Sequence, residues 1–557
     1  MKKMTAILLG LGLIIASLSA CGGSAEETTA GVDAPAQETA AADTAAAAAE
    51  DGVLRVAHIK DFQTLDVHKT TNDFMVPINA FDRLFEVVKN DDGSTGLKNS
   101  LVEDYTVSED GLTYDFTLRE GLKFSDGSPL TASDVEYTIV RALTLPETVQ
   151  TDIYSSIAGA SELMDGTADT LSGFTITDDT HFTIELSAPY AGFLGQLATP
   201  GASIMSKAAN EAAGDSFGQE ASATIGSGPY MVESWTRNAD LVLVQNPNYW
   251  GEAPDVKKVI ISVVPDPSTM SMMFQKGEID MLDADYIDSA VFDSTYRLPE
   301  YEDSIVSADR LATTYFALNE NVEPLNDVRV RKAIQMAIDR QTILDTVYSG
   351  DGTLVDGIFS HGLIGFSEDN QGWLEYDPEG AKALLEEAGY GDGFTLEISS
   401  DNSSTASLLL VMQIIQQELA EIGITVNIEP YDEASWLDLR LSGEMPSYIS
   451  TWTADYNDPD NFIYTFFGTP ENVVSRSLNY PDQEIIDRVA AARAITDETE
   501  RLAEYAALEN KIIKEDAAWV PLFSRSHLFV LGDRVESFVP HWAGYSDFIF
   551  SSFKLAE

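Results

Sequence analysis

The chain has 557 residues and carries 91 acidic against 33 basic side chains, a formal net charge of -58. A field of this sign repels polyanions, so nucleic acid and anionic membrane surfaces are excluded as partners. Cys21 is the single cysteine, which excludes disulfides and thiolate metal sites in the rest of the chain. The length suggests about three domains.

The first residues, 1–20, are typical of a secretory signal peptide. Two lysines precede an apolar run from Ala6 to Ala16, and the letters LSA end directly before Cys21. This pattern resembles the lipobox of bacterial lipoproteins, in which the cysteine after the cleavage site is acylated. We therefore expect a lipid anchor at Cys21; the alternative is an ordinary signal peptide that happens to end beside a cysteine.

A flexible tether is predicted after Cys21, at residues 22–51. This stretch is rich in Gly, Ala, Thr and Glu and has almost no large apolar side chain before Val53. Such a composition cannot bury enough surface to offset chain entropy. No second apolar stretch of membrane-spanning length follows, so we expect the folded body to lie beside the membrane and not in it.

The body opens with patterns of both secondary-structure types. Apolar and polar residues alternate from Thr113 to Phe124 around Arg119-Glu120-Gly121, which predicts two strands joined by a turn. Thr131 followed by Asp134 is a helix-capping signal, and apolar residues recur at helical spacing after it. This region is therefore predicted to form a hairpin followed by a helix.

Three more helices are predicted further along the chain. Asp327 can cap a helix whose apolar face runs to Leu344, and Asp377 followed by Pro378 opens another that ends at Gly389. A third helix is predicted at residues 408–422, followed by a strand at 424–431. Helices that alternate with strands indicate an α/β body.

Catalytic and metal-binding patterns are weak. Residues 214–218 match G-x-S-x-G, but that motif needs a buried strand before Ser216, whereas residues 207–213 are alanine-rich and helix-like. The histidines are dispersed, and residues 455–460 lack the Gly and the final Glu of a calcium loop. We therefore expect no catalytic residue, no metal and no cofactor.

A set of ordered motifs resembles family 5 of the extracellular solute-binding proteins, the oligopeptide and dipeptide receptors of ABC importers. The motifs are TLDVH (64–68), SEDGLTY (108–114), LREGLKFSDG (118–127), LTASDV (130–135), GSGPY (226–230), NPNYW (246–250), GEID (277–280), NDVRVRKA (326–333) and AIDR (337–340). They occur in order over nearly the whole body, which makes coincidence very unlikely.

The resemblance implies a periplasmic-binding-protein type II-like α/β fold of three interleaved lobes that close on the ligand by a hinge. The implied first lobe takes 52–96, 196–304 and 526–557, the second 97–195, and the third 305–525. The implied function is a monomeric, lipid-anchored receptor that binds oligopeptides and delivers them to ABC permease subunits with their ATPase. The chain itself would not be an enzyme.

The predicted ligand site lies in TWTADY (451–456), between a strand from Ser447 and a polar turn. A receptor for many peptides must fix the ammonium end, for which a carboxylate is the natural partner. The resemblance assigns that role to Asp455 beside Trp452, with Tyr456 next to them. The alternative is that Asp455 caps the turn and Trp452 fills the core.

Asn72 and Phe74 are further predicted contacts, at the position where the family's first lobe meets the ligand backbone. Dipeptide receptors of the family fix the ligand carboxylate with an upstream Arg, but here no Arg occurs between Phe394 and Leu439. A longer or differently anchored ligand is therefore favoured. Alternatives are an oligosaccharide stacked on Trp452 or Trp436, another small solute, a nickel complex, or a surface enzyme or signalling protein.

Overall fold

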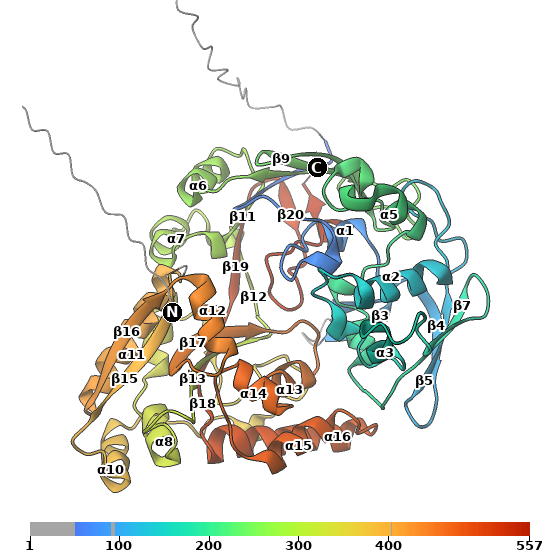
Figure 1. Cartoon of the computed structure of the whole chain (residues 1–557). Helices are drawn as coiled ribbons and strands as arrows, with labels where there is room; N and C mark the ends of the chain where they lie inside the picture. Colours follow the sequence, from blue (N-terminus) through green and yellow to red (C-terminus); the bar gives the residue numbers. More distant parts are fainter. Residues whose placement is uncertain (1–50, 91–94, 403, 557) are drawn as a thin grey trace, which may run out of the picture. The chain divides into compact units, whose positions relative to one another are not determined.

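The computed structural model describes residues 51–90, 95–402 and 404–556, which form an α/β structure (Figure 1). The predicted signal peptide, Cys21 and nearly all of the predicted tether lie outside the described residues. Helices and strands alternate along the chain, which confirms the predicted fold class. No helix in the described part of the chain is long and apolar enough to cross a membrane.

The first sheet combines strands from distant parts of the sequence. Its strands, in spatial order, are β1 (Val53–His58), β10 (Lys258–Val263), β9 (Asp240–Gln245) and β8 (Tyr230–Thr236). β1 runs parallel to β10, with Leu54 opposite Val259 and Val56 opposite Ile261. All four side chains are buried, in a core that also takes in C-terminal aromatic residues. Apolar burial therefore fixes the start of the body to much later segments.

The second sheet is antiparallel throughout. Its strands, in spatial order, are β4 (Val102–Val107), β5 (Thr113–Leu118), β7 (His181–Glu185) and β6 (Phe174–Ile176). The predicted strand at the start of the 113–124 hairpin is confirmed as β5, but the second strand is wrong. Phe124 N–H donates to Ser128 O at 2.9 Å and Leu130 N–H to Leu122 O at 3.0 Å, so the segment folds back on its own turn. Its apolar alternation arises because Leu122 and Phe124 anchor an irregular loop in the core.

The helix after this loop, α2 (Ala132–Thr144), begins at the predicted capping signal. Asp134 Oδ2 accepts a hydrogen bond from the backbone N–H of Thr131 at 2.9 Å. Val135, Ile139 and Ala142 lie on one buried face of the helix, which packs against the second sheet's core. The capping box and the apolar face thus specify this helix locally.

The third sheet joins strands from the second half of the chain. Its strands, in spatial order, are β14 (Gly352–Leu354), β18 (Trp519–Arg525), β13 (Ala312–Leu318) and β17 (Ser447–Thr453). The helix predicted from Asp327 to Leu344 is two helices, α8 (Val328–Met336) and α9 (Arg340–Tyr348). Asp339 accepts a hydrogen bond from Thr342 N–H at 3.0 Å, so it acts as a new N-cap that starts the second helix.

A parallel strand pair follows, β15 (Phe394–Asp401) with β16 (Ile424–Tyr431). α11 (Ala406–Glu421) connects the two strands and lies beside them in Figure 1. The predictions of a helix near 408–422, of the strand at 424–431 and of α10 (Pro378–Ala388) with its Asp377 cap and Gly389 end are all confirmed.

Two short strand pairs and several helices lie outside the sheets described so far. The strands of the two pairs are β2 (Phe85–Lys89) with β3 (Thr95–Asn99), and β20 (Val535–Ser537) with β21 (Lys554–Leu555). The other α-helices are α1 (Pro77–Ala80), α3 (Ala160–Met164), α4 (Phe193–Gln196), α5 (Lys207–Ala213), α6 (Pro267–Gln275), α7 (Ser289–Tyr296), α12 (Glu433–Leu441), α13 (Asp460–Phe467), α14 (Pro470–Ser475), α15 (Gln483–Ala492) and α16 (Glu498–Glu509).

Two short links connect the third sheet to a further sheet of order β11 (Met281–Asp283), β19 (His527–Leu531) and β12 (Ile305–Ala308). The chain passes from β12 to β13 through residues 309–311 and from β18 to β19 through Ser526. β12 pairs with β19, and β13 pairs with β18. Two neighbouring strand connections of this kind can act as a hinge between the bodies on either side.

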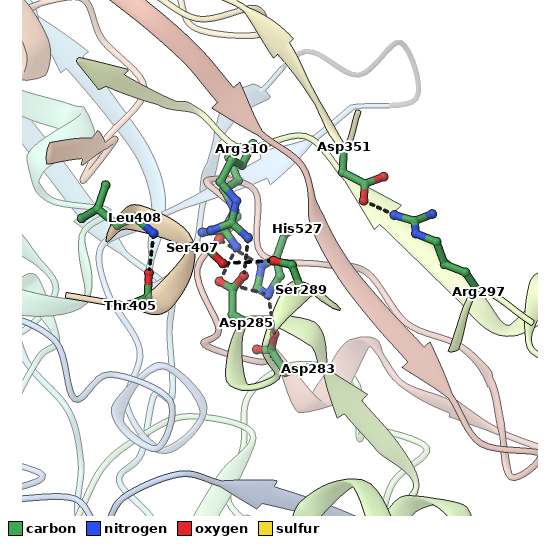
Figure 2. A network of polar contacts seen from close by, with 12 residues as sticks. Asp283, Asp285, Ser289, Arg297, Arg310, Asp351, Thr405, Ser407, Leu408 and His527 are labelled. Carbon is green, nitrogen blue, oxygen red and sulfur yellow. Dashed lines mark hydrogen bonds and ion pairs between the residues drawn. The ribbon is translucent and has the colours of Figure 1, made fainter. Parts of the chain in front are cut away.

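Charged side chains gather at these links, and Figure 2 shows Asp283, Asp285, Arg310 and His527 close together. We call these four residues, with Arg525 beside Asp285, the junction cluster. Arg310 Nη2 forms an ion pair with Asp285 Oδ2, and Arg525 Nη2 lies 3.7 Å from Asp285 Oδ1. His527 Nε2 is 2.8 Å from Asp283 Oδ1. The cluster thus connects the end of β11 to both links.

Figure 2 also shows two contacts outside the junction cluster, one between charged side chains and one between hydroxyl groups. Arg297, just after α7, pairs with Asp351, and Ser289 Oγ lies 3.3 Å from Ser407 Oγ at the start of α11. The boundaries of the three lobes stay a prediction. Under that prediction, both contacts join a residue of the first lobe to a residue of the third.

Candidate functional site

A cavity of about 1120 Å³ is lined by segments that lie far apart in the sequence. All five predicted ligand residues line it: Asn72, Phe74, Trp452, Asp455 and Tyr456. A volume of this size is at or above the range of ordinary small-molecule pockets, which is about 300–1,000 Å³. The fold therefore brings residues of the early chain and of the segment after β17 to one space.

Asp455 follows the end of β17 and is held from α13. Its backbone N–H donates to Asn461 Oδ1 at 2.9 Å, and Asn461 Nδ2 donates to Asp455 Oδ2 at 3.0 Å. Tyr545 Oη donates a long hydrogen bond of 3.4 Å to Asp455 Oδ1. The carboxylate accepts no backbone N–H among these bonds, so it does not cap the turn. Asp458 does so instead, accepting from Asp460 N–H at 3.0 Å.

The charge of Asp455 is poorly compensated. The residue is exposed to the cavity and enclosed by protein beyond it, and this burial raises the pKa of its carboxyl. Hydrogen bonds from Asn461 and Tyr545 and the charge of Arg476 offset only part of the effect. Within the described chain no cation lies within ion-pair distance of it. A ligand ammonium would stabilise the ionised form, which makes Asp455 a fitting cation partner.

Trp452 forms one wall beside this carboxylate. Its Nε1–H donates to Asn461 O at 3.0 Å, and its ring meets Phe466 edge-on with centroids 5.6 Å apart. The indole is half-buried and lines the cavity. One part of the side chain therefore packs in the core while another borders the cavity, so the ligand role of Trp452 stays a prediction.

Tyr456 differs from its neighbours because its hydroxyl is already used. The side chain is buried, and Oη lies 2.9 Å from Tyr190 Oη and 3.1 Å from Asp460 Oδ2. Asp460 in turn pairs with Arg493 Nε at 2.9 Å. Tyr456 therefore offers its ring, and not its hydroxyl, to the cavity.

Asn72 and Phe74 come from the loop that precedes α1. Asn72 is exposed, and its backbone N–H donates to Thr70 Oγ1 at 3.3 Å. Phe74 is half-buried against the core of the first sheet. The structure places both residues at the cavity wall.

Several cavity residues escaped the sequence analysis. Asp82 accepts a hydrogen bond from Trp250 Nε1 at 3.0 Å, and burial raises the pKa of its carboxyl to about 7. Asp547 and Tyr545 reach the cavity from the C-terminal segment, and burial likewise raises the pKa of Asp547 to about 7. Trp250 stands in the motif NPNYW, so the sequence offered a signal for it. Tyr545 and Asp547 belong to no motif.

The catalytic pattern at Ser216 is not a nucleophile elbow. α5, not a strand, precedes it, and Ser216 Oγ donates to Glu220 Oε1 at 3.2 Å on the exposed surface. Residues 455–460 do not form a calcium loop, because Asp458 and Asp460 are paired with Arg501 and Arg493. In the described chain, Asp283, Asp285 and His527 of the junction cluster lie close enough together to hold a metal ion. Arg310 and Arg525 already neutralise the charge of Asp285, however.

Comparisons with known proteins identify the family of this chain. The family model for bacterial extracellular solute-binding proteins, family 5, matches residues 96–473. The probable D,D-dipeptide-binding periplasmic protein DdpA of Escherichia coli K12 is 30% identical over 504 residues, which cover 88% of this chain and 92% of that protein. The glutathione-binding protein GsiB of Salmonella paratyphi A is 29% identical over 491 residues, which cover 86% and 89%.

A solved structure shows the same fold. The ABC transporter-associated periplasmic binding protein DppA from Helicobacter pylori, in complex with the peptide STSA, matches with a TM-score of 0.73 at 25% identity. The match covers 91% of this chain and 98% of that one. The chain therefore belongs to family 5 of the bacterial extracellular solute-binding proteins, has their type II-like α/β fold, and is a transport binding protein and not an enzyme.

Proposed function

We propose that this protein captures oligopeptides outside the cytoplasmic membrane and delivers them to the permease of an ABC importer, whose ATPase subunits supply the energy. The observation that carries the proposal is the carboxylate of Asp455. It faces a cavity of about 1120 Å³, is oriented by Asn461, and has no cationic partner in the described chain. A peptide ammonium fits this place by charge and by hydrogen bonding.

The relatives support a peptide ligand. DdpA is named for D,D-dipeptides and GsiB for glutathione, and the DppA structure holds a four-residue peptide, STSA. The described residues of the stretch 399–403, where dipeptide receptors of the family would place an Arg, do not line the cavity. This absence and the cavity volume favour ligands longer than a dipeptide.

Two features of the chain outside the described residues complete the proposal. Cys21 would carry the lipid anchor, and residues 22–51 would be the tether that lets a monomeric receptor reach its permease. The test is a Cys21→Ser variant followed by fractionation of cells. We expect the protein to leave the membrane fraction, and continued membrane association of the variant would contradict the anchor.

A sugar ligand is the second candidate, favoured by the aromatic lining of the cavity. Trp250, Trp452 and Trp542 all line it, whereas Trp436 does not. Stacking on aromatic rings is a common mode of binding for apolar sugar faces. A nickel complex has less support, because the cavity shows no histidine cluster among its described residues.

Native mass spectrometry of the purified protein, followed by denaturation and identification of released molecules, separates these candidates. A ladder of peptides is the expected result and would give their preferred length. A single sugar or a metal complex would keep the family and overturn the peptide ligand. Loss of peptide uptake on deletion of the gene is the corresponding result in cells.

A further inference from the structure

The basic residues that line the cavity differ in how their charge is balanced. They are Arg83, Lys98, Arg476 and Arg493. Arg493 pairs with Asp460 at 2.9 Å, and Lys98 is exposed on β3. The charge of Arg83 acts on the neighbouring Asp82, whose pKa it lowers against the larger effect of burial, and Nη1 of Arg83 is buried without a hydrogen-bond partner in the described chain. Arg476 is the remaining cation, and the described chain shows no hydrogen bond or ion pair to its guanidinium.

Aromatic rings hold the guanidinium of Arg476 in place. Its Cζ lies 4.8 Å from the centroid of the Trp452 ring and 5.0 Å from that of Phe466. Its carbonyl oxygen accepts a hydrogen bond from Tyr448 Oη at 2.9 Å, which fixes the backbone after α14. A guanidinium held over aromatic rings by cation–π contacts, and not by hydrogen bonds, keeps its N–H donors available for a planar anion.

Arg476 and Asp455 are organised around the same indole. Trp452 Nε1–H donates to Asn461 O, the side chain of Asn461 binds Asp455, and Arg476 stacks on the Trp452 ring. The two charges do not form an ion pair. Burial lowers the pKa of Arg476, and Asp455 is the carboxylate in the cavity that acts against this effect.

This arrangement restricts the ligand. A ligand with only an ammonium at this end would place two cations, its own and Arg476, around one carboxylate. A half-buried cation without a partner is unfavourable, and an anion from the ligand would remove that cost. The cavity therefore suits a ligand that carries opposite charges close together at one end.

We propose that Arg476 determines specificity by binding a carboxylate that the ligand carries beside its ammonium group. Peptides that begin with Glu or Asp supply it from the first side chain. Peptides that begin with a γ-linked glutamyl residue supply it from the α-carboxylate. The inference rests on the proposed function, since it assigns the amino end of a peptide to Asp455.

A double-mutant cycle between protein and ligand tests this role. Titration calorimetry compares Glu-Ala-Ala with Gln-Ala-Ala on the wild-type protein and on Arg476→Gln. We expect the wild type to prefer the acidic peptide by about tenfold or more, as for a charge-assisted hydrogen-bonded pair. The variant should lose this preference and bind the two peptides with similar affinity.

The matched control is Arg237→Gln. Arg237 also stacks on a tryptophan, with its Cζ 3.5 Å from the Trp235 ring centroid, but it does not line the cavity. It should leave the preference intact. Where Arg476→Gln does not fold, Arg476→Lys serves instead, because it keeps the charge, removes the planar fork and should reduce the preference without abolishing it.

γ-Glu-Ala-Ala distinguishes the two sources of the carboxylate. Tighter binding of this peptide than of Glu-Ala-Ala assigns the α-carboxylate, and weaker binding assigns the side chain; both support the role of Arg476. Equal affinity of the wild type for Glu-Ala-Ala and Gln-Ala-Ala overturns the inference, as does an equal loss for both in the variant. If the wild type binds no peptide at all and binds a sugar, the proposed function fails and the inference fails with it.

Discussion

Two carboxylates of this protein, Asp455 and Asp285, are enclosed to a similar degree, but their pKa values are shifted in opposite directions. At Asp455 burial raises the pKa, and only hydrogen bonds and the charge of Arg476, which forms no ion pair with it, oppose the rise. At Asp285 burial also opposes ionisation, but Arg310, His527 and Arg525 together lower the pKa below its usual range. The opposite pKa shifts therefore come from the charged partners of the two carboxylates and not from how deeply each is buried. The junction cluster is neutralised by the protein itself, whereas the carboxylate of Asp455 has no ion-pair partner in the described chain, as expected if a ligand supplies the cation.

A raised pKa does not by itself identify a binding site. Burial raises the pKa of Glu509 to about 7, as it does for Asp82 and Asp547. Glu509 accepts hydrogen bonds from Ile358 N–H at 2.6 Å and Phe359 N–H at 2.9 Å and does not line the cavity. It is therefore a structural carboxyl. Uncompensated charge points to function only where it also faces space that a ligand can enter.

The largest effect is expected at Asp455. Asp455→Asn keeps the shape and the contact to Asn461 but removes the charge that a peptide ammonium needs. Peptide affinity should fall by about 30-fold or more, corresponding to about 2 kcal/mol or more. Calorimetric titration measures it, with exposed Asp169→Asn as the control. Unchanged affinity in Asp455→Asn would remove the residue from the site.

In the junction cluster, Arg310→Gln should weaken the fold more than it weakens binding. The variant removes one of the positive charges that compensate the carboxylate of Asp285. Because the side chain of Asp285 is 23% exposed, water offsets part of this effect, and we expect a loss of only about 2 kcal/mol in unfolding free energy. The double variant with Asp285→Asn should recover part of this loss. Thermal unfolding of the four proteins checks both statements, and additive losses would show that the pair does not interact.

The pH dependence of Asp285 follows from the same pairing. Its pKa is lower in the folded protein than in the unfolded chain. The pairing therefore contributes stability above the unfolded pKa of about 4, and this contribution is lost as the pH falls below it.

At Asp547 the sign is reversed. Its pKa is raised from 3.8 to about 7 on folding, so the neutral carboxyl is favourable below about pH 4 and stability is lost as the pH rises towards 7. Asp547→Asn imitates the neutral form. The unliganded variant should match the wild type at pH 4 and exceed it at pH 8 by at least about 1 kcal/mol and at most about 4 kcal/mol, the value for the full shift. Melting temperatures at both pH values test this, and a parallel pH profile in the two proteins would contradict it.

The smallest effect is expected at the neutral contact beside the junction cluster. Ser407→Ala removes the 3.3 Å contact to Ser289, which is long for a hydroxyl pair. We expect a change of less than about 0.5 kcal/mol in unfolding free energy. A larger loss, measured by thermal unfolding, would show that neutral bonds and not ion pairs hold this region.

Much of the fold could be predicted wherever the signal is local. α2, α10 and α11 start or end at capping residues that are visible in the sequence, and β16 follows the glycine after α11. The two wrong predictions came where a pattern of apolar residues was taken alone, without a second local feature that outweighs it. Asp339 starts a new helix inside a continuous apolar pattern, and Leu122 and Phe124 alternate like a strand because a loop is anchored in the core.

The site divides in the same way. Asp455 and Trp452 stand in a motif, and so the sequence alone was enough to propose them, together with family membership and the absence of catalytic patterns. Arg476, Asp547, Tyr545 and the junction cluster have no local pattern, because their roles depend on which distant charges lie next to them. Local hydrogen bonds and apolar periodicity are written within a few residues of chain. The balance of buried charge is a property of neighbours in space, and only the tertiary structure decides it.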